Sequence, residues 1–206
     1  MAAEAVNNKH SSMRVEVNQQ PITALDAYGS IPIAFEVNAV LDVATTNGEF
    51  VLTERKLDRP YVKDYDAIDG EQPHQWASRF DVSNWGVFMA FVEGKPVGGT
   101  VVARNTPGLM ILEGRDDLAV LWDIRVSPRA RGQGVGAALF REAETWAKAK
   151  GCRQIKVETQ NINVAACRFY ARQGCVLRVV NRYAYPTLPD ETQLLWYKDL
   201  VTVNDI

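Results

Sequence analysis

The sequence predicts a mixed α/β fold of the α+β type, in which a twisted, mostly antiparallel sheet is flanked by helices. Two apolar hairpin patterns occupy the first half of the chain, one strand-helix-strand-helix unit follows, and two further strands close it. Antiparallel strands on either side of a single crossover unit are typical of this class and not of a doubly wound parallel sheet.

A first hairpin is predicted between residues 31 and 57. The strand-like run Ile33–Val40 is followed by a turn at Thr46-Asn47-Gly48, which leads into a second run, Glu49–Thr53. Asn-Gly between two such runs supplies the positive φ angles that a tight reversal needs. We expect a short helix near residues 75–80. Before it lies an acidic stretch that we expect to be a solvated loop, with Asp64, Asp66, Asp69 and Glu71.

A second hairpin and a central strand come next. Residues 86–92 and 97–103 are apolar runs on either side of a turn at residues 93–96. We expect residues 104–118 to form a loop that connects two strands. The apolar run 119–126 then predicts a strand, which Ser127-Pro128 ends.

The most regular helix pattern begins near Gly134, and Gly151 is a natural end for it. A strand at 154–159, a helix at about 164–173 and strands at 175–185 and 192–200 complete the chain. The long helix is predicted from apolar residues on one face at i, i+3 and i+4 spacing, namely Val135, Ala138, Leu139, Ala143, Trp146 and Ala147.

Length and composition limit the function classes. A chain of 206 residues, 47% hydrophobic and 23% charged, fits one domain at residues 13–206 after a polar segment, 1–12, that we expect to be disordered. A net charge of −2 without a basic run gives no support for nucleic-acid binding. We find neither a membrane-spanning run nor a secretory signal, and the three cysteines lack metal-ligand spacing. The sequence therefore predicts a cytoplasmic protein without a metal site.

A glycine-rich turn, residues 129–136, lies between the strand 119–126 and the long helix. The first N–H groups of a helix have no internal partner and carry the positive end of its dipole, so a phosphate group suits this place. Arg131 adds a mobile positive charge beside it. Three glycines in five residues at a helix start are costly without a ligand, which disfavours a purely structural turn.

One alternative for this turn is a dinucleotide site, because Gly132-x-Gly134-x-x-Ala137 fits the loose fingerprint and Glu158 lies about 20 residues further on. Three features count against it. Residues 127–131 separate the first glycine from its strand, the chain closes in antiparallel strands, and the upstream hairpins do not belong to a doubly wound sheet.

The assembled residues resemble the GNAT superfamily of N-acetyltransferases. Its pyrophosphate motif is Gln or Arg, two residues, Gly, one residue, then Gly or Ala, and Arg131–Gly136 satisfies every position. The stretch Asn163–Gly174 looks like the family's second signature. The resemblance implies a sheet splayed at its middle and acetyl-CoA as co-substrate. It implies cofactor contacts from Ile124, Arg125, Val126, Arg131, Gly132, Gln133, Gly134, Val135, Gly136, Asn163 and Tyr170.

Acyl transfer from a thioester to an amine needs a group that takes the ammonium proton and a group that protonates the departing thiolate. The family suggests Tyr170 as the acid and Glu158 as the base. Asp123 is a rival base, because a carboxylate inside an apolar strand is costly to bury without a partner. Its structural alternative is a salt bridge to Arg125, and water is a third route for the proton. We predict substrate contacts from Trp122, Asp123 and Glu158.

A narrower resemblance, to streptothricin acetyltransferases, is carried by residues 123–126, 158–163 and a closing hairpin with Tyr185 and Leu195-Trp196-Tyr197. It implies acetylation of the β-lysine amine of a cationic antibiotic, and hence antibiotic resistance. Two alternatives stay open at this point: acetylation of protein N-termini or lysines, and a non-catalytic module that senses acyl-CoA. Dimerisation is common in such enzymes, so a homodimer is also expected.

Overall fold

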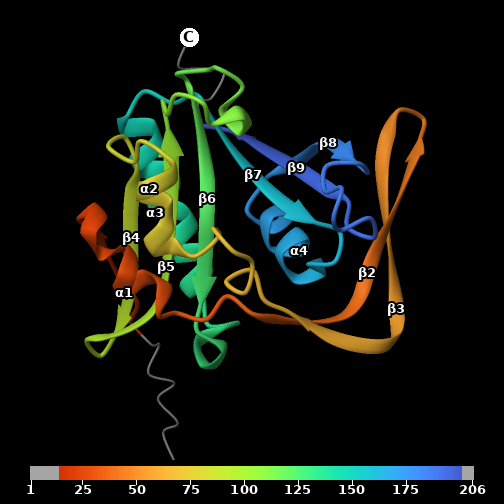
Figure 1. Cartoon of the computed structure of the whole chain (residues 1–206), viewed down its shortest axis with the longest axis horizontal. Helices are drawn as coiled ribbons and strands as arrows, with labels where there is room; N and C mark the ends of the chain where they lie inside the picture. Colours follow the sequence, from red (N-terminus) through yellow and green to blue (C-terminus); the bar gives the residue numbers. More distant parts are fainter. Residues whose placement is uncertain (1–13, 201–206) are drawn as a thin grey trace, which may run out of the picture.

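The computed structural model describes residues 14–200 and arranges their main strands in a seven-stranded sheet, so the expected disordered segment 1–12 lies outside the described residues (Figure 1). All neighbouring strands are antiparallel except β6 and β7. This confirms the predicted mixed, mostly antiparallel sheet. Across the sheet the strands are β1 (Glu16–Gln20), β4 (Gly86–Val92), β5 (Lys95–Arg104), β6 (Leu118–Val126), β7 (Gln154–Gln160), β9 (Gln193–Asp199) and β8 (Val176–Asn181).

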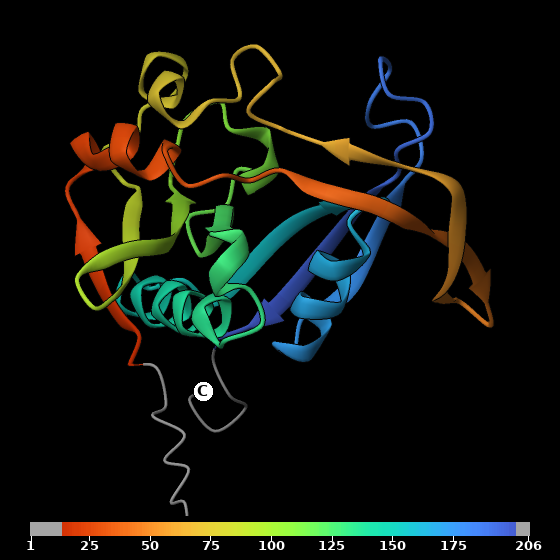
Figure 2. The same cartoon turned by 90° about the horizontal axis from the view of Figure 1, so that it is seen from below.

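Helices cover both faces of the sheet (Figure 2). On one face, α3 (Val135–Ala149) and α4 (Val164–Arg172) pack over a core that includes Leu139 and Phe140. On the other, α1 (Leu25–Gly29) and α2 (Trp76–Arg79) cover a second core around Tyr28 and Trp76. Short 3-10 turns complete these layers: η1 (Ile22–Ala24), η2 (Pro73–Gln75), η3 (Met110–Leu112) and η4 (Pro128–Ala130). No helix within residues 14–200 is long and apolar enough to cross a membrane.

Two adjacent glycines in β5 let both layers approach the sheet closely. A Cβ atom at Gly98 would lie 3.0 Å from Val135 Cγ1 of α3, and one at Gly99 would lie 2.6 Å from the ring of Tyr28. A larger residue at either position would force the helix layer away, because protein cores are close-packed.

The sheet opens between β6 and β7. These strands pair in parallel only where Leu118–Leu121 faces Gln154–Val157, although β6 continues to Val126 and β7 to Gln160. Past that point each strand keeps its antiparallel neighbour on the outer side, β5 and β9 respectively. The two halves of the sheet therefore splay apart, as the family resemblance implied.

A β-bulge in β6 sets the side-chain directions at this opening. Trp122 is the residue left unpaired where the β5–β6 register shifts. An extra residue reverses the alternation of side chains beyond it. As a result Asp123 and Arg125 face the layer of Tyr28, with Arg125 Cζ 5.0 Å from the centroid of that ring, while Ile124 packs against the α3 side.

The first predicted hairpin forms a separate ribbon, β2 (Phe35–Thr46) and β3 (Glu49–Lys63), which extends beside α4 in Figure 1. Asn47 and Gly48 have φ angles of 53° and 81°, so both turn residues adopt the expected positive φ. Asn161, in the loop after β7, holds the middle of β2, because its backbone oxygen and side-chain amide bond to the backbone of Leu41 at 2.9 and 3.2 Å.

Several parts of the fold differ from the sequence prediction, including α1, which was not predicted, and β3, which runs to Lys63 and not to Thr53. The edge strand β1 was not predicted, because Glu16-Val17-Asn18-Gln19-Gln20 contains a single apolar residue. The predicted strand 175–185 ends at Asn181 instead. Residues after it form a loop in which Tyr185 turns back toward Glu158, as described below.

Candidate active site

A cavity of about 730 Å³ lies at the opening between β6 and β7. It is lined by the end of β6 from Trp122 to Val126, by the glycine turn, and by Glu158 near the end of β7. Asn163 and Tyr170 line it from α4 and its cap. The structure thus brings almost all of the predicted site residues together, although they come from distant parts of the sequence.

Gln133 and Val135 are the exceptions among the predicted cofactor residues. Val135 is 1% exposed and belongs to the core under α3. The Gln133 side chain instead donates to the backbone oxygen of Arg129 at 2.7 Å. Neither side chain lines the cavity, so only the backbone amides of these two residues are suited to hold a ligand.

The glycine turn has the form of an anion cradle. Gly132 and Gly134 have φ angles of 76° and 86°, and no heavy atom lies within 4 Å of a Cβ placed on either residue. Gly134 caps α3 without a side-chain hydrogen bond, which leaves the first-turn N–H groups uncapped by a side chain. These groups and the open space above them fit the pyrophosphate of a coenzyme A molecule.

Arg131 is more firmly held than the sequence suggested. Its Nε donates to the backbone oxygen of Val126 at 3.0 Å, and its Nη2 to that of Ala34 at 3.0 Å. The guanidinium therefore presents a fixed, not a mobile, positive charge at the mouth of the cavity. Its bond to Ala34 also ties the glycine turn to the segment that leads into β2.

The end of β6 offers main-chain groups to a ligand. On its outer side the strand is paired, with Thr100 opposite Ile124 and Gly98 opposite Val126. On its inner side, within the described residues, the pairing with β7 stops at Leu121. A chain of amides such as pantetheine can complete this exposed edge, in the way that a peptide adds to a sheet.

Arg125 is the centre of a buried ion network below the cavity. Its side chain is 1% exposed and contacts two carboxylates, Asp123 at 2.5 Å and Asp66 at 2.9 Å. Its Nη1 also donates to the backbone oxygen of Ile31 at 3.2 Å. A guanidinium taken out of water needs such partners, because an unpaired buried charge is strongly destabilising. The salt bridge considered as the structural alternative for Asp123 is therefore present.

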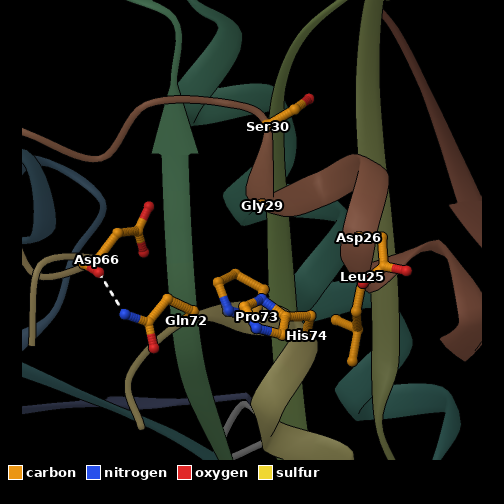
Figure 3. A pocket seen from close by; sticks show the side chains of 8 residues that line it. All are labelled: Leu25, Asp26, Gly29, Ser30, Asp66, Gln72, Pro73 and His74. Atoms are coloured by element: carbon orange, nitrogen blue, oxygen red, sulfur yellow. Dashed lines mark hydrogen bonds between the residues drawn. The ribbon is translucent and has the colours of Figure 1, made fainter. Parts of the chain in front are cut away.

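Asp66 corrects the sequence prediction of a solvated acidic loop. It binds both Nη atoms of Arg125, at 2.9 and 3.2 Å, and its side chain is 24% exposed. A second cavity of about 330 Å³, near α1, shares Asp66 as a wall, and Gln72 Nε2 donates there to the Asp66 backbone oxygen at 2.5 Å (Figure 3). Nothing in the acidic run itself marks this residue, because its partner lies 59 positions away.

Glu158 is held by neutral donors only. The Tyr185 hydroxyl donates to its Oε1 at 2.5 Å, and Gln193 Nε2 donates to its Oε2 at 2.8 Å. Among the ion pairs of residues 14–200, none includes Glu158. Its carboxylate is oriented without being neutralised. Sequence reasoning noted Tyr185 in the closing hairpin but missed Gln193, which faces Glu158 from the neighbouring strand.

The neighbour of Glu158 on the same strand, Lys156, is not part of a solvated face. It is 2% exposed and donates to Glu113 Oε1 at 2.7 Å and to the backbone oxygen of Ile111 at 2.9 Å. The alternation of charged and apolar residues in β7 therefore does not mark a solvated face, because Lys156 is buried and Glu158 is half-buried at the wall of the cavity.

Tyr170 lies on α4, 4% exposed, and packs against Phe140 and Phe169 with ring centroids 6.0 and 5.1 Å away. Burial raises the pKa of the Tyr170 phenol well above its ordinary value, and the negative charge of Asp123 raises that pKa further. The phenol therefore keeps its proton at neutral pH and can act as a hydrogen-bond donor in the cavity.

Asn163 both caps α4 and lines the cavity. Its Oδ1 accepts from Ala166 N at 3.1 Å, which makes it the N-cap of α4, and the residue also lines the cavity. Because the cap uses the carbonyl oxygen, the amide nitrogen is the group available for a ligand.

Comparison with known proteins identifies the class that this fold and site define. Residues 52–175 match the acetyltransferase (GNAT) family, and the chain belongs to that family. It is an N-acetyltransferase that uses acetyl-CoA. Within residues 14–200 no group of three or more His, Cys, Asp or Glu side chains is arranged to hold a metal ion.

The chain is similar to several streptothricin acetyltransferases. It is 30% identical to streptothricin acetyltransferase A of Bacillus subtilis (strain 168) over 156 residues, which is 75% of this chain and 82% of that protein. It is 32% identical to the streptothricin acetyltransferase of Escherichia coli, over 79% and 84% of the two chains. A Bacillus anthracis (strain Ames) protein assigned as a streptothricin acetyltransferase and solved with acetyl coenzyme A superposes with a TM-score of 0.73 at 26% identity, covering 90% and 99%.

The anion cradle can be tested by substituting one of its glycines. Gly134→Ala should weaken acetyl-CoA binding roughly tenfold, because a side chain strains the left-handed backbone and distorts the first turn of α3. Gly108→Ala is a matched control, since Gly108 has a φ of 78° and equally open surroundings but does not line the cavity. Isothermal titration with acetyl-CoA measures both. Equal affinities for the two variants would contradict a ligand site at the turn.

Proposed function

We propose that this enzyme transfers the acetyl group of acetyl-CoA to a primary amine of a small cationic substrate, the β-lysine amine of streptothricin. The named relatives support this assignment, because this chain aligns with more than four-fifths of the length of each at 30–32% identity. The physical observation that carries it is the Glu158 carboxylate, which faces the cavity, is fixed by Tyr185 and Gln193, and has no cationic partner among residues 14–200. A protonated amine is the partner that completes such a group.

The substrate end of the cavity also suits a small amine. The segment after β3 crosses the opening, with Asp66 bonded to Arg125 on β6 and Tyr65 bonded to Gln160 at the end of β7. Phe35 and Trp122 line the cavity beside these residues and offer aromatic faces to a cation. Because this segment crosses the opening, the cavity favours a compact acceptor over an extended peptide. Its aromatic walls and the Glu158 carboxylate, which has no cationic partner among the described residues, favour a cationic one.

The reaction follows from these positions. Acetyl-CoA supplies the activated acyl group as a thioester. Glu158 binds the ammonium group of the acceptor and takes one proton from it, directly or through water, so that the nitrogen lone pair can form the new C–N bond. Tyr170 donates its proton to the sulfur as the C–S bond breaks, and the second proton, which the nitrogen loses after forming the C–N bond, restores the Tyr170 phenol directly or through water. The products are an amide and free coenzyme A, and the proton taken by Glu158 returns to solvent.

Free-thiol release from acetyl-CoA tests the proposed substrate. The purified protein should turn over streptothricin in preference to aminoglycosides, polyamines and short peptides, and mass spectrometry should find one acetyl group on the β-lysine amine. Turnover of peptides alone would overturn the proposed substrate while leaving the family assignment intact.

Tyr170→Phe tests the proposed acid. The variant should lose about 100-fold in kcat while its affinity for acetyl-CoA stays unchanged, because only the donated proton is removed. Tyr183→Phe, at a residue that is 89% exposed, is the control and should behave like the parent.

The pH profile gives the same proposal a second test. Because burial raises the pKa of Tyr170, its phenol stays protonated above pH 10, which is about the ordinary pKa of tyrosine. We therefore expect kcat to show no loss from tyrosine ionisation between about pH 8 and about pH 10. A basic limb in that range that disappears in Tyr170→Phe would contradict the raised pKa of Tyr170, although it would still identify Tyr170 as the group that titrates.

A further inference from the structure

The two strands at the opening are joined by a side-chain network that the reaction as described does not use. We propose that Tyr65 is a positioning residue for Glu158: it fixes the amide of Gln160 so that the Tyr185 hydroxyl points its proton at the Glu158 carboxylate. This inference rests on the proposed role of Glu158 as the group that receives the acceptor amine.

The hydrogen bonds of this network run in one direction. The Tyr65 hydroxyl donates to Gln160 Oε1. Gln160 Nε2 donates to the Tyr185 oxygen at 2.8 Å, and the Tyr185 hydroxyl donates to Glu158 Oε1 at 2.5 Å. Gln160 Nε2 also makes a longer contact, 3.5 Å, with Glu158 Oε1, and the network ends at the carboxylate. Because an amide has a donor end and an acceptor end, the orientation of Gln160 determines the direction of every later bond.

Tyr65 stabilises this orientation, because its hydroxyl donates to the carbonyl oxygen of the amide. Burial raises the pKa of the Tyr65 phenol, and the negative charges of Glu191 and Glu158 raise it further, so the hydroxyl stays protonated and donates. While Tyr65 donates, the carbonyl end of the Gln160 amide is held on its side and the NH2 group faces Tyr185. Without that hydroxyl, Gln160 can turn its Oε1 toward Tyr185, which then donates to the amide, and Glu158 loses its shortest hydrogen bond.

Tyr65 is itself held on several sides. Its ring packs on Phe35 with centroids 5.9 Å apart, and Lys63 Nζ lies 5.3 Å from its ring centroid. Lys63 is fixed in turn by Glu191 at 2.5 Å. The next residue, Asp66, is anchored by Arg125 from the opposite strand. The Tyr65 hydroxyl therefore has a defined place relative to β7, which a positioning residue requires.

A double-mutant cycle tests the coupling, using whichever amine the parent protein acetylates. Tyr65→Phe should lower kcat about fivefold, and Tyr185→Phe about twentyfold, with the KM for acetyl-CoA unchanged in both. Because Tyr65 acts through Tyr185, the double variant should be within about twofold of Tyr185→Phe alone. Tyr61→Phe, on the same ribbon but 44% exposed and outside the cavity, is the control and should retain the parent kcat.

Gln160→Met gives a second cycle if a tyrosine variant is poorly folded. It should reproduce the loss of Tyr65→Phe, and adding Tyr65→Phe to it should change kcat by less than about twofold. Losses that multiply in both cycles, or an unchanged kcat in Tyr65→Phe, would overturn the proposal. Since the assay needs only an accepted amine, failure of the streptothricin assignment and failure of the Tyr65 coupling are separate results.

Discussion

The separation of β6 from β7 is the constraint on which the rest of the site depends. Parallel pairing stops at Leu121 and Val157, and the two strands then carry their free inner edges apart. An unpaired strand edge is normally a liability in a protein, since its backbone groups need partners. Here the edge is suited to an amide-containing cofactor, and the splay opens a cavity between the two halves of the sheet. The glycine turn lies at the end of β6, so the same opening leads directly to the anion cradle on α3.

The splay also separates two carboxylates that have different electrostatic environments. Asp123 is buried beside Arg125, which neutralises it, and burial raises its pKa while Arg125 opposes that rise. Glu158 is oriented by uncharged donors and has no cationic partner among residues 14–200. The β-bulge at Trp122 contributes to this division, because it directs Asp123 and Arg125 to the side of Tyr28. Asp123 therefore holds Arg125 in place beside the cavity, and Glu158 is the carboxylate that we propose for the substrate.

The sequence predicted those features that are encoded locally. Asn47-Gly48 located the ribbon turn, and the glycines before α3 located an open turn at the start of that helix, because positive φ angles restrict the residue type. The pairing of Asp66 with Arg125 and the bonds of Tyr185 and Gln193 to Glu158 could not be predicted, because they join residues far apart in the chain. Asp66 was for that reason interpreted as a solvated loop residue. The expected homodimer and the roles assigned to single site residues stay predictions.

The division of roles between the two carboxylates is the central claim, and paired isosteric variants measure it most directly. Glu158→Gln should lower kcat/KM for the amine about 100-fold or more, while acetyl-CoA binding and the free energy of unfolding stay close to the parent values. Asp123→Asn should instead destabilise the fold by about 3 kcal/mol, because it leaves the Arg125 charge short of a partner in the interior. The reverse result would contradict this account: an active Glu158→Gln variant beside an Asp123→Asn variant that is stable, binds acetyl-CoA and does not turn over.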